Sequence, residues 1–347
     1  SDKNAAGIEF LFKKNKVDYI RGEASLEKPG AVVVRLADRN TETHTAANIL
    51  IATGVLDPQP KSMVIIGAGA IGVEFAYFYN AFGTKVTLVE LLPNILPVED
   101  TEVSQTLEKA LTKQGIKILT QSKTTKAEVT GKGVNVTIEG KTTEKISADV
   151  CLVAIGVTPL LPNGKLQPKL TERGYIETND RYETSLPNVY AAGDIIGPPW
   201  LAHVASWEAI QAMEGMFDKI EPRKVRVFPG CTYCQPQVAS VGLTERAAKE
   251  SSRNFRVGKF PFSASGKARA IGETDGFVKL IIGEPHGEIL GAHIIGPEAT
   301  EMIAELGLAM TLEATHEEIE ATIHAHPTLS EAVHEATGQA FGHAIHI

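Results

Sequence analysis

The clearest pattern of apolar and polar positions lies in the first third of the chain. Met63–Ile66 is an uninterrupted apolar run, which is typical of a strand buried on both faces of a parallel sheet. A helical period follows from Ala70 to Phe82, and a second predicted strand, Lys85–Val89, is followed by the acid Glu90. Strand, helix and strand in this order predict a βαβ unit.

Three glycines separate the first strand from the helix as G-x-G-x-x-G, at Gly67, Gly69 and Gly72. The first permits a tight turn, the second lets the backbone approach a pyrophosphate, and the third lets the helix pack close to the strand. Ala70 and Ile71 open the helix, whose free N–H groups and positive dipole end attract phosphate. We therefore predict a dinucleotide site, with a glycine-rich turn in another kind of α/β protein as the alternative.

Glu90 indicates which dinucleotide is bound. It stands 18 residues after Gly72, near the ~20 expected of the acid that binds the ribose hydroxyls of NAD. A carboxylate accepts hydrogen bonds from a ribose diol and repels a 2′-phosphate. Leu91 and Leu92 follow, where an NADP enzyme more often carries arginine. The pattern favours NAD over NADP.

The rest of the chain forms three further blocks. Residues 1–55 predict too few elements to bury a core alone, so this block should complete another layer. Residues 158–224 are loosely patterned, and residues 225–347 place strands before helices, which is typical of a separate α+β domain. Up to residue 157 we expect helices at Ile8–Asn15 and Thr101–Gln114, and strands at Val17–Ile20, Ala31–Leu36, Thr43–Ile51, Ile116–Thr120, Thr124–Val129, Val134–Glu139, Lys141–Ile146 and Asp149–Ile155. Beyond it we expect strands at Val238–Val241, Arg256–Pro261, Gly276–Ile282 and Glu288–Ile295, and helices at Val204–Phe217, Ala299–Leu312, Thr315–Ala325 and Leu329–Thr337.

A second strand-like run also ends on a carboxylate. Ala191–Asp194 closes an apolar stretch, and α/β sheets place ligand groups just past their strand ends. A turn with Asp194 as a helix N-cap is the alternative. The run Ile49–Gly54 likewise ends in glycine outside the NAD unit, so the two together predict a second dinucleotide domain, split around the first. The predicted fold class is α/β, with two Rossmann-like dinucleotide-binding domains and a C-terminal α+β domain.

Composition narrows the function classes. The 347 residues suggest two or three domains, and 43% hydrophobic with 22% charged residues is ordinary for a globular protein. A net charge of −8 argues against nucleic acid or an anionic membrane as a partner. No apolar run is long enough to span a membrane, and the polar start SDKNAAG is no signal peptide. Three cysteines give no disulfide framework and favour a reducing, cytoplasmic location.

The cysteines and His324 are expected to be structural. Cys231 and Cys234 form a C-x-x-C at the entrance to a strand, but no second such pair exists for zinc. Cys151 lies in an apolar strand and should be core. His324 and the tail His343–His346 are expected to bind no metal, so no metal site is predicted.

Four motifs occur in a recognisable order: an Ala-Thr-Gly strand end, GAGAIGVE, Ala154–Gly156 and YAAGD. Together they resemble the FAD-dependent pyridine nucleotide-disulfide oxidoreductases, and the segment His324–Glu331 (HAHPTLSE) is similar to the dihydrolipoamide dehydrogenases among them. The resemblance covers essentially the whole chain. It implies a split, incomplete FAD-binding domain (1–55 and 158–224), an inserted NAD-binding domain (56–157) and a C-terminal dimerisation domain (225–347).

The resemblance also implies residue roles. Gly156 would lie close to the NAD held by the glycine loop and Glu90. Glu74 would lie near nicotinamide and flavin, with a first-turn helix acid favoured by the dipole as the alternative. The residues implied for FAD are Gly22, Thr53, Gly54, Gly193, Asp194, Leu201, Ala202 and His203.

His326 is implied as the general base and Glu331 as its carboxylate partner. A dithiol is mostly protonated at neutral pH, whereas the thiolate is the nucleophile in disulfide exchange, so a base is needed. Imidazole suits this task, and the carboxylate orients the ring. Thr328-x-x-Glu331 is also a capping box before a helix, which is the alternative for Glu331. His326–Pro327 is a candidate cis peptide.

The implied reaction is oxidation of protein-bound dihydrolipoyl groups with reduction of NAD⁺ through FAD and a redox disulfide. The implied partners are a second copy of the chain and the lipoyl domains of 2-oxo acid dehydrogenase complexes, with glycine cleavage as a further setting. A glutathione or mercuric reductase and a non-catalytic NAD-binding fragment are the alternatives. Glu90 argues against an NADP enzyme, and the lack of cysteine after Cys234 argues against members with C-terminal thiols.

The sequence departs from the family in two elements. It has no strand-GxGxxG-helix for the ADP of FAD and no G-x-x-C-x-x-x-x-C helix for the redox disulfide. A further gap is expected at Thr53–Pro58, where the family has a longer connection. We expect residues 1–347 to be renumbered parts of a longer chain, with a natural truncated paralogue as the alternative. A chain limited to these residues could bind NAD but could not form the reducible pair.

Overall fold

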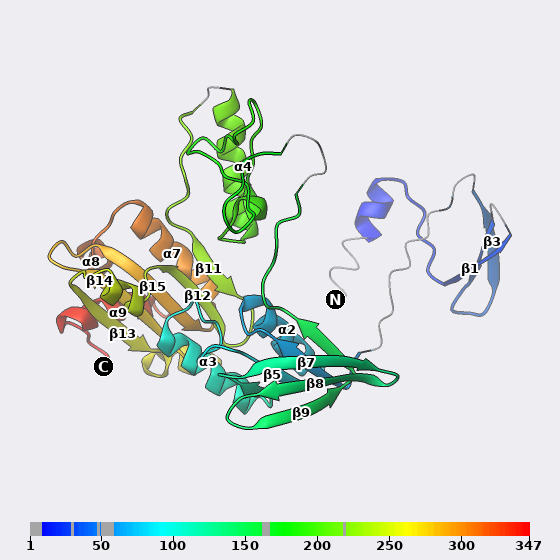
Figure 1. Cartoon of the computed structure of the whole chain (residues 1–347), viewed down its shortest axis with the longest axis horizontal. Coiled ribbons are helices and arrows are strands. Elements are labelled where there is room, and N and C mark those ends of the chain that lie inside the picture. The colour runs from blue at the N-terminus through cyan, green and yellow to red at the C-terminus, as the bar shows by residue number, and fades with distance from the viewer. Residues whose placement is uncertain (1–8, 29–30, 47–48, 50–58, 162–166, 218–219) are drawn as a thin grey trace. The chain divides into compact units, whose positions relative to one another are not determined.

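A computed structural model describes residues 9–28, 31–46, 49, 59–161, 167–217 and 220–347 (Figure 1). The chain divides into two units, Ser1–Pro58 and Gln59–Ile347. The fold is mixed α/β, as predicted. Among the described residues, no helix has the length and apolar character needed to cross a bilayer.

The first unit holds a helix at residues 9–14 and an antiparallel sheet in the order β1-β2-β3. Its strands are β1 (Glu23–Lys28), β2 (Ala31–Arg35) and β3 (Thr41–Thr45). The strand predicted at Val17–Ile20 is wrong, because this stretch has no ladder partner among the described residues. The polar segment Glu23–Lys28 forms a strand instead, because it pairs antiparallel with β2, with an irregularity between Leu26 and Lys28. Of the strand predicted at Thr43–Ile51, residues 47–48 and 50–51 lie outside the described part.

The nucleotide unit, residues 59–157, contains the predicted βαβ core. A parallel sheet runs in the order β10-β4-β5-β6, with α2 and α3 connecting its strands. Its elements are β4 (Ser62–Ile66), α2 (Ala70–Ala81), β5 (Lys85–Val89), α3 (Thr101–Lys113), β6 (Lys117–Leu119) and β10 (Val150–Val153). An antiparallel meander of β7 (Lys123–Thr130), β8 (Gly133–Glu139) and β9 (Thr143–Ala148) precedes β10.

The strand β10 is less buried than its apolar sequence indicates. It forms the edge of the parallel sheet and pairs with β4, so Val150 and Val153 are exposed. Cys151 is half-buried and packs beside the apolar cluster under the meander, so its expected core position is only partly right. An apolar run therefore identified the strand but not its place in the sheet.

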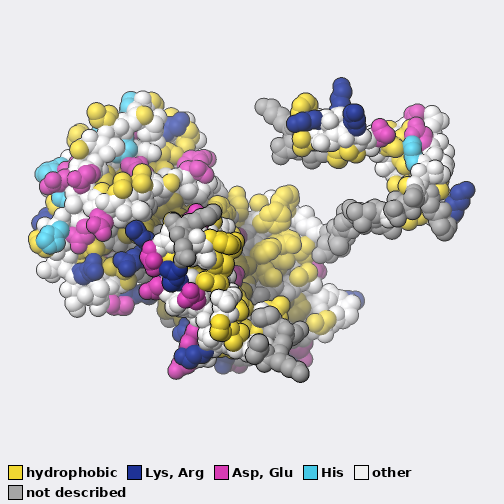
Figure 2. All heavy atoms as spheres, turned by 90° about the horizontal axis from the view of Figure 1, so that it is seen from above, with side chains coloured by type: hydrophobic (Ala, Val, Ile, Leu, Met, Phe, Trp, Pro, Cys, Tyr) yellow, Lys and Arg dark blue, Asp and Glu magenta, His cyan; other side chains and the backbone are white. Residues whose placement is uncertain are grey.

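The segment after the nucleotide unit is mostly irregular. It contains a short 3₁₀ helix, η1 (Gly193–Ile196), and the helix α4 (Ala202–Met216), which begins two residues before the predicted start. These two elements contact each other. Apolar side chains exposed on α4 include Ile210 and Met213, and Figure 2 shows exposed apolar side chains gathered on one face of the larger unit.

The C-terminal domain is a five-stranded antiparallel sheet in the order β11-β12-β15-β14-β13. Its strands are β11 (Pro229–Thr232), β12 (Gln237–Gly242), β13 (Phe255–Pro261), β14 (Phe277–Gly283) and β15 (Ile289–Gly296). Its helices are α5 (Glu245–Glu250), α6 (Gly266–Ile271), α7 (Ala299–Thr311), α8 (His316–Ala321) and α9 (Glu331–Phe341). The two six-residue helices α5 and α6 were not predicted, because they are shorter than two helical turns and show little periodicity; Thr244 and Ser265 cap them.

Both faces of this sheet are covered, and every residue of β14 and β15 is buried. Helices α7 and α9 pack on its strands, while α3 of the nucleotide unit contacts β15. Val238, Phe277 and Ile295 of the sheet belong to one apolar cluster with Leu107 and other residues of the nucleotide unit. The nucleotide unit and the C-terminal sheet thus share a core.

Candidate active site

The glycine loop has the geometry that a phosphate site needs. Gly67 has φ +98°, and a Cβ there would lie 2.4 Å from the carbonyl oxygen of Ala154. A Cβ on Gly72 would lie 1.9 Å from the carbonyl oxygen of Gly67. Around the Cβ position of Gly69, by contrast, no atom lies within 4 Å. Two of the glycines are therefore required by the packing of the loop itself, whereas the middle one faces open space where a pyrophosphate could approach.

The start of α2 also leaves backbone donors available. Gly69 is the N-cap residue and supplies no side-chain hydrogen bond, so the first N–H groups of the helix have no cap from it. Ala70 and Ile71 follow and are exposed. Such an end attracts anions through its donors and its dipole. Gly156, with φ +126°, follows β10 beside this loop, because Gly67 packs against Ala154.

Glu90 is buried and fixed by two backbone donors. One carboxylate oxygen accepts the Ala68 N–H at 2.7 Å, and the other accepts the Leu92 N–H at 2.9 Å. Each oxygen keeps a further lone pair that can accept a ribose hydroxyl. The residues of this loop fit an NAD molecule.

Glu74 has a role that the sequence did not reveal. It is the fifth residue of α2 and lies beyond the first turn, so the alternative of a first-turn acid is wrong. Its Oε1 accepts the N–H of Tyr233 at 2.9 Å, which ties α2 to the C-terminal domain. Its implied place near nicotinamide and flavin stays a prediction.

The residues implied for FAD are brought together in part. Gly193 has φ +77°, and its N–H donates to Glu208 Oε2 at 2.8 Å. Asp194 is exposed within η1, and the N-cap of α4 is Leu201, so the alternative of Asp194 as that cap is wrong. The exposed residues Ala202 and His203 open α4, and His203 Nε2 lies 2.9 Å from the carbonyl oxygen of Pro229. Because η1 and α4 contact each other, these residues lie on adjoining elements.

The other implied FAD residues lie in or near the first unit. Gly22 packs against β2, because a Cβ there would lie 2.5 Å from Val34 Cγ1 and 2.6 Å from the carbonyl oxygen of Arg35. Packing thus already explains this glycine. Thr53 and Gly54 lie outside the described residues.

Glu208 was missed by the sequence analysis. It is buried on α4 together with Val204 and Ala212. These three positions are four residues apart and so share one helix face. A carboxylate on an otherwise apolar face was the signal that could have found it.

His326 and Glu331 form a hydrogen-bonded pair at the start of α9. His326 Nδ1 lies 2.8 Å from Glu331 Oε1, and the His326 side chain is 80% exposed. Glu331 Oε2 accepts the N–H of Thr328 at 2.8 Å. Burial alone would raise the pKa of the Glu331 carboxyl, but the Thr328 N–H and His326 outweigh it and hold that pKa below its usual value.

The capping-box reading of this segment is half right. Glu331 does accept a backbone N–H three residues earlier, but the Thr328 hydroxyl donates to the Ala325 carbonyl at 2.6 Å. The N-cap of α9 is Ser330. One carboxylate therefore both closes the turn and orients the imidazole with Nε2 directed away from it. The His326–Pro327 peptide bond is cis.

The thiols and His324 have structural surroundings. Burial raises the pKa of Cys234 to about 12, which keeps the thiol protonated and unreactive. Burial also raises the pKa of Cys231. His324 Nε2 lies 2.7 Å from Glu305 Oε1 with 7% of its side chain exposed. In the part of the chain that the structure describes, no cluster of three or more metal-ligating side chains occurs.

The chain matches two families along its length. Residues 55–209 match the pyridine nucleotide-disulphide oxidoreductases, and residues 228–337 match the dimerisation domain of that family. The chain therefore belongs to the pyridine nucleotide-disulphide oxidoreductases, as the motifs predicted. This family binds FAD and a pyridine nucleotide. The exact domain limits given above stay predictions.

Its relatives make the likeness more specific. A dihydrolipoyl dehydrogenase from Rhizobium etli is 41% identical over 383 residues, which covers 98% of this chain and 80% of the relative. A dihydrolipoyl dehydrogenase from Zymomonas mobilis is 42% identical over 379 residues, which covers 99% of this chain and 80% of the relative. Because both alignments are longer than the 347 residues of the chain, each relative has residues within the aligned span that this chain lacks.

Solved structures show the same fold. LpdA from Mycobacterium tuberculosis matches with a TM-score of 0.75 and 24% identity over 97% of this chain and 80% of that one. The HOCl-induced flavoprotein disulfide reductase RclA from Escherichia coli matches with a TM-score of 0.75 and 22% identity over 97% of this chain and 84% of that one. At these identities the likeness concerns the fold alone.

The middle glycine, Gly69, and the last one, Gly72, give a matched test of the loop. Gly72→Ala should cost about 1–3 kcal/mol of folding free energy, because its methyl group meets a carbonyl oxygen inside the turn. Gly69→Ala should fold normally but bind NADH at least about tenfold more weakly, because its methyl group occupies the approach of the pyrophosphate. Thermal unfolding and calorimetric titration with NADH measure both effects. Equal NADH affinity in Gly69→Ala and wild type would place the pyrophosphate elsewhere.

Proposed function

We propose that this protein is a dihydrolipoyl dehydrogenase, which oxidises protein-bound dihydrolipoyl groups to the disulfide and reduces NAD⁺ to NADH. The observation that carries this is the exposed His326 hydrogen-bonded to Glu331 at the start of α9, in the part of the chain that matches the family's dimerisation domain. Relatives at 41% and 42% identity that bear this name support it.

The pair can supply the proton transfer that a thiol substrate requires. Glu331 is hydrogen-bonded to Nδ1 of His326, so Nε2 of the same ring can accept a thiol proton from an approaching substrate. The resulting imidazolium is stabilised by the carboxylate, whose pKa is held low, so the proton stays on the ring. With 80% of the side chain exposed, His326 can reach a group carried by another molecule.

In a homodimer, the exposed pair of His326 and Glu331 could act at the other subunit. His326 would serve the redox disulfide of the other subunit, because the domain that carries it matches the family's dimerisation domain. The 347 residues lack the helix that bears this disulfide, so the reaction needs a longer chain that includes it. Lipoyl domains of 2-oxo acid dehydrogenase complexes would bring the dithiol. FAD, when bound, supplies electron transfer between sulfur and nicotinamide. Asp194, Ala202 and His203 would hold it, while the glycine loop and Glu90 would hold NAD.

Replacing the base tests this proposal. His326→Gln should lower the rate of dihydrolipoamide oxidation by about 10²–10⁴-fold, the usual contribution of a positioned base, and leave NADH affinity unchanged. His343→Gln is the matched control, because this histidine is also exposed, at 69% of its side chain, and lies in the same domain. Steady-state assays with dihydrolipoamide and NAD⁺, run beside assays with glutathione disulfide and NADPH, measure the effect. Wild-type turnover in His326→Gln would remove this residue from the mechanism, and a preference for the second substrate pair would indicate another disulfide reductase.

Glu90→Gln tests the nucleotide assignment. The amide has one acceptor atom where the carboxylate uses two, and it no longer repels a 2′-phosphate. NAD⁺ affinity should fall by about tenfold or more, as expected when a charged hydrogen bond is lost, and the ratio of NADP⁺ to NAD⁺ affinity should rise. Titration with both nucleotides measures the ratio. An unchanged ratio would contradict the placement of the ribose at Glu90.

A further inference from the structure

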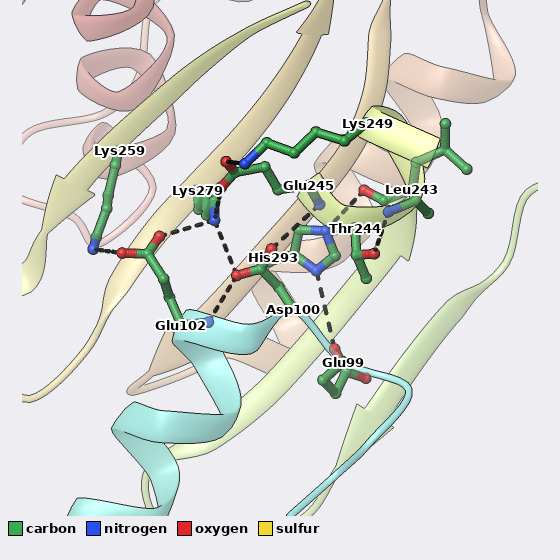
Figure 3. Close-up of polar contacts among 11 residues, drawn as sticks. Glu99, Asp100, Glu102, Leu243, Thr244, Glu245, Lys249, Lys259, Lys279 and His293 are labelled. Carbon is green, nitrogen blue, oxygen red and sulfur yellow. Dashed lines mark hydrogen bonds and ion pairs between the residues drawn. The ribbon is translucent and has the colours of Figure 1, made fainter. Parts of the chain in front are cut away.

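A buried lysine joins the nucleotide unit to the C-terminal sheet (Figure 3). Lys279 lies in β14 with 1% of its side chain exposed. Its Nζ lies 3.0 Å from Asp100 Oδ1, 2.8 Å from Glu102 Oε2 and 2.7 Å from Glu245 Oε2. An ammonium has three N–H donors, so each of them has a carboxylate acceptor. We call these four residues the charged seam.

Asp100 connects three elements at once. Its Oδ1 also accepts the N–H of Glu102 at 3.0 Å, which makes it the N-cap of α3. Its Oδ2 accepts the N–H of Glu245 at 3.3 Å, at the start of α5. A single carboxylate therefore holds the first turn of a nucleotide-unit helix, the first turn of a C-terminal helix and a lysine of the sheet.

The surroundings of the seam contain further charges. Lys259 Nζ, on β13, lies 2.8 Å from Glu102 Oε1. Lys249 Nζ, on α5, lies 2.6 Å from Glu245 Oε1. His293 of β15 donates Nε2–H to the Leu243 carbonyl at 2.9 Å, and its Nδ1 lies 4.0 Å from Oε2 of Glu99. Figure 3 shows these groups around Lys279.

All four members of the seam carry their charge at neutral pH. Burial alone would raise the pKa of Asp100 and of Glu102, but the lysines bound to them hold both values below the usual range. Hydrogen bonds from Lys249 and Lys279 lower the pKa of Glu245. Burial would lower the pKa of Lys279, yet its three carboxylates raise it.

Stability alone does not explain such a group. Burying charges costs desolvation that their attraction only roughly offsets, and apolar side chains of equal volume often do as well. Three oxygens from two domains satisfy the ammonium in one relative placement only, because any shift leaves a buried charge unpaired. The seam therefore selects an orientation of the nucleotide unit on the sheet.

A chain of hydrogen bonds leads from the seam to the nucleotide site. Leu96, in the loop before Asp100, donates its N–H to the Ala68 carbonyl at 2.7 Å. Ser104 of α3 donates its hydroxyl to the Leu96 carbonyl at 3.1 Å. Ala68 is the residue between Gly67 and Gly69, and its own N–H donates a hydrogen bond to the Glu90 carboxylate. The start of α3 is therefore hydrogen-bonded to the Leu96 loop, and the Leu96 loop is hydrogen-bonded to the glycine turn.

We propose that Lys279 is a positioning residue for the dinucleotide site, which it reaches through Asp100 and Leu96. This inference rests on the proposed function for its catalytic meaning. Lys279 contacts no reacting group. It sets where the glycine loop and Glu90 stand relative to the C-terminal domain, to which α2 is also tied through Glu74 and Tyr233.

Two variants and one control test the proposal. Asp100→Asn keeps a good N-cap for α3 but removes the charge that Lys279 binds. Lys279→Met removes the ammonium at similar length. Lys259→Met is the control, because Lys259 binds the same Glu102 but is 38% exposed and so contributes little.

The main readout is amide hydrogen exchange at Ala68 and Leu92, the two N–H groups bound by Glu90. Exchange there should be roughly tenfold faster in Asp100→Asn and Lys279→Met than in wild type, and near wild type in Lys259→Met, a size expected of coupling between connected sites. Affinity for ADP-ribose should weaken in the same two variants. Should Lys279→Met fail to fold, Asp100→Asn decides alone.

The outcomes separate the two proposals. Unchanged exchange at Ala68 and Leu92, or an equal increase over the whole of β14 and β15, would overturn the positioning role and leave only a structural one. Failure of wild type to bind ADP-ribose or NADH would instead overturn the proposed function, while the exchange result still judges the seam.

The pH dependence of stability provides an independent prediction. The folded-state pKa values of Asp100, Glu102 and Glu245 are lowered, so their stabilisation is present above about pH 4 and is lost as the pH falls through the folded values. Lys279→Met leaves these carboxylates without their shared cation, so protonation should relieve their repulsion. Between about pH 6 and about pH 4 the wild type keeps this stabilisation, whereas the unpaired carboxylates of Lys279→Met take up protons in the folded state. The melting temperature should therefore fall less in Lys279→Met than in wild type over this range. Parallel curves from scanning calorimetry would contradict charge pairing at the seam.

Discussion

The contact between the nucleotide unit and the C-terminal sheet determines the arrangement of the larger unit. Its apolar part is one cluster that contains Leu107 of α3 together with Val238, Phe277 and Ile295 of the sheet. Its polar part is the buried ammonium of Lys279. The apolar cluster supplies non-directional cohesion, while the ammonium accepts one geometry only. A sheet with both faces covered is the result.

The candidate site residues depend on this arrangement because they come from separate elements. Glu90 follows β5, the glycine loop precedes α2, and His326 precedes α9. Each is fixed locally by backbone groups: Ala68 and Leu92 hold Glu90, and Thr328 holds the partner of His326. Local bonds thus set the direction of each side chain, whereas domain packing sets the distance between them.

Much of the larger unit could be predicted from the sequence, because its signals are local. The glycine spacing, the apolar runs and the terminal acid identified β4, α2 and β5 almost to the residue. Prediction failed where pairing rather than periodicity forms the element. The polar strand Glu23–Lys28 exists through its ladder with β2, and the short helices α5 and α6 exist through their caps. The first-turn role of Glu74 and the N-cap role of Asp194 were wrong, because helix starts depend on backbone geometry.

By itself the sequence determined the family, the order of the motifs and the chemistry of each motif, since these depend on residue types at fixed short spacing. Only the tertiary structure decided which charges meet. Asp100 and Lys279 lie 179 residues apart, and Glu74 and Tyr233 lie 159 apart. No short-range pattern encodes such a contact, because it forms when two layers bury each other's surfaces and every polar group inside must find a partner.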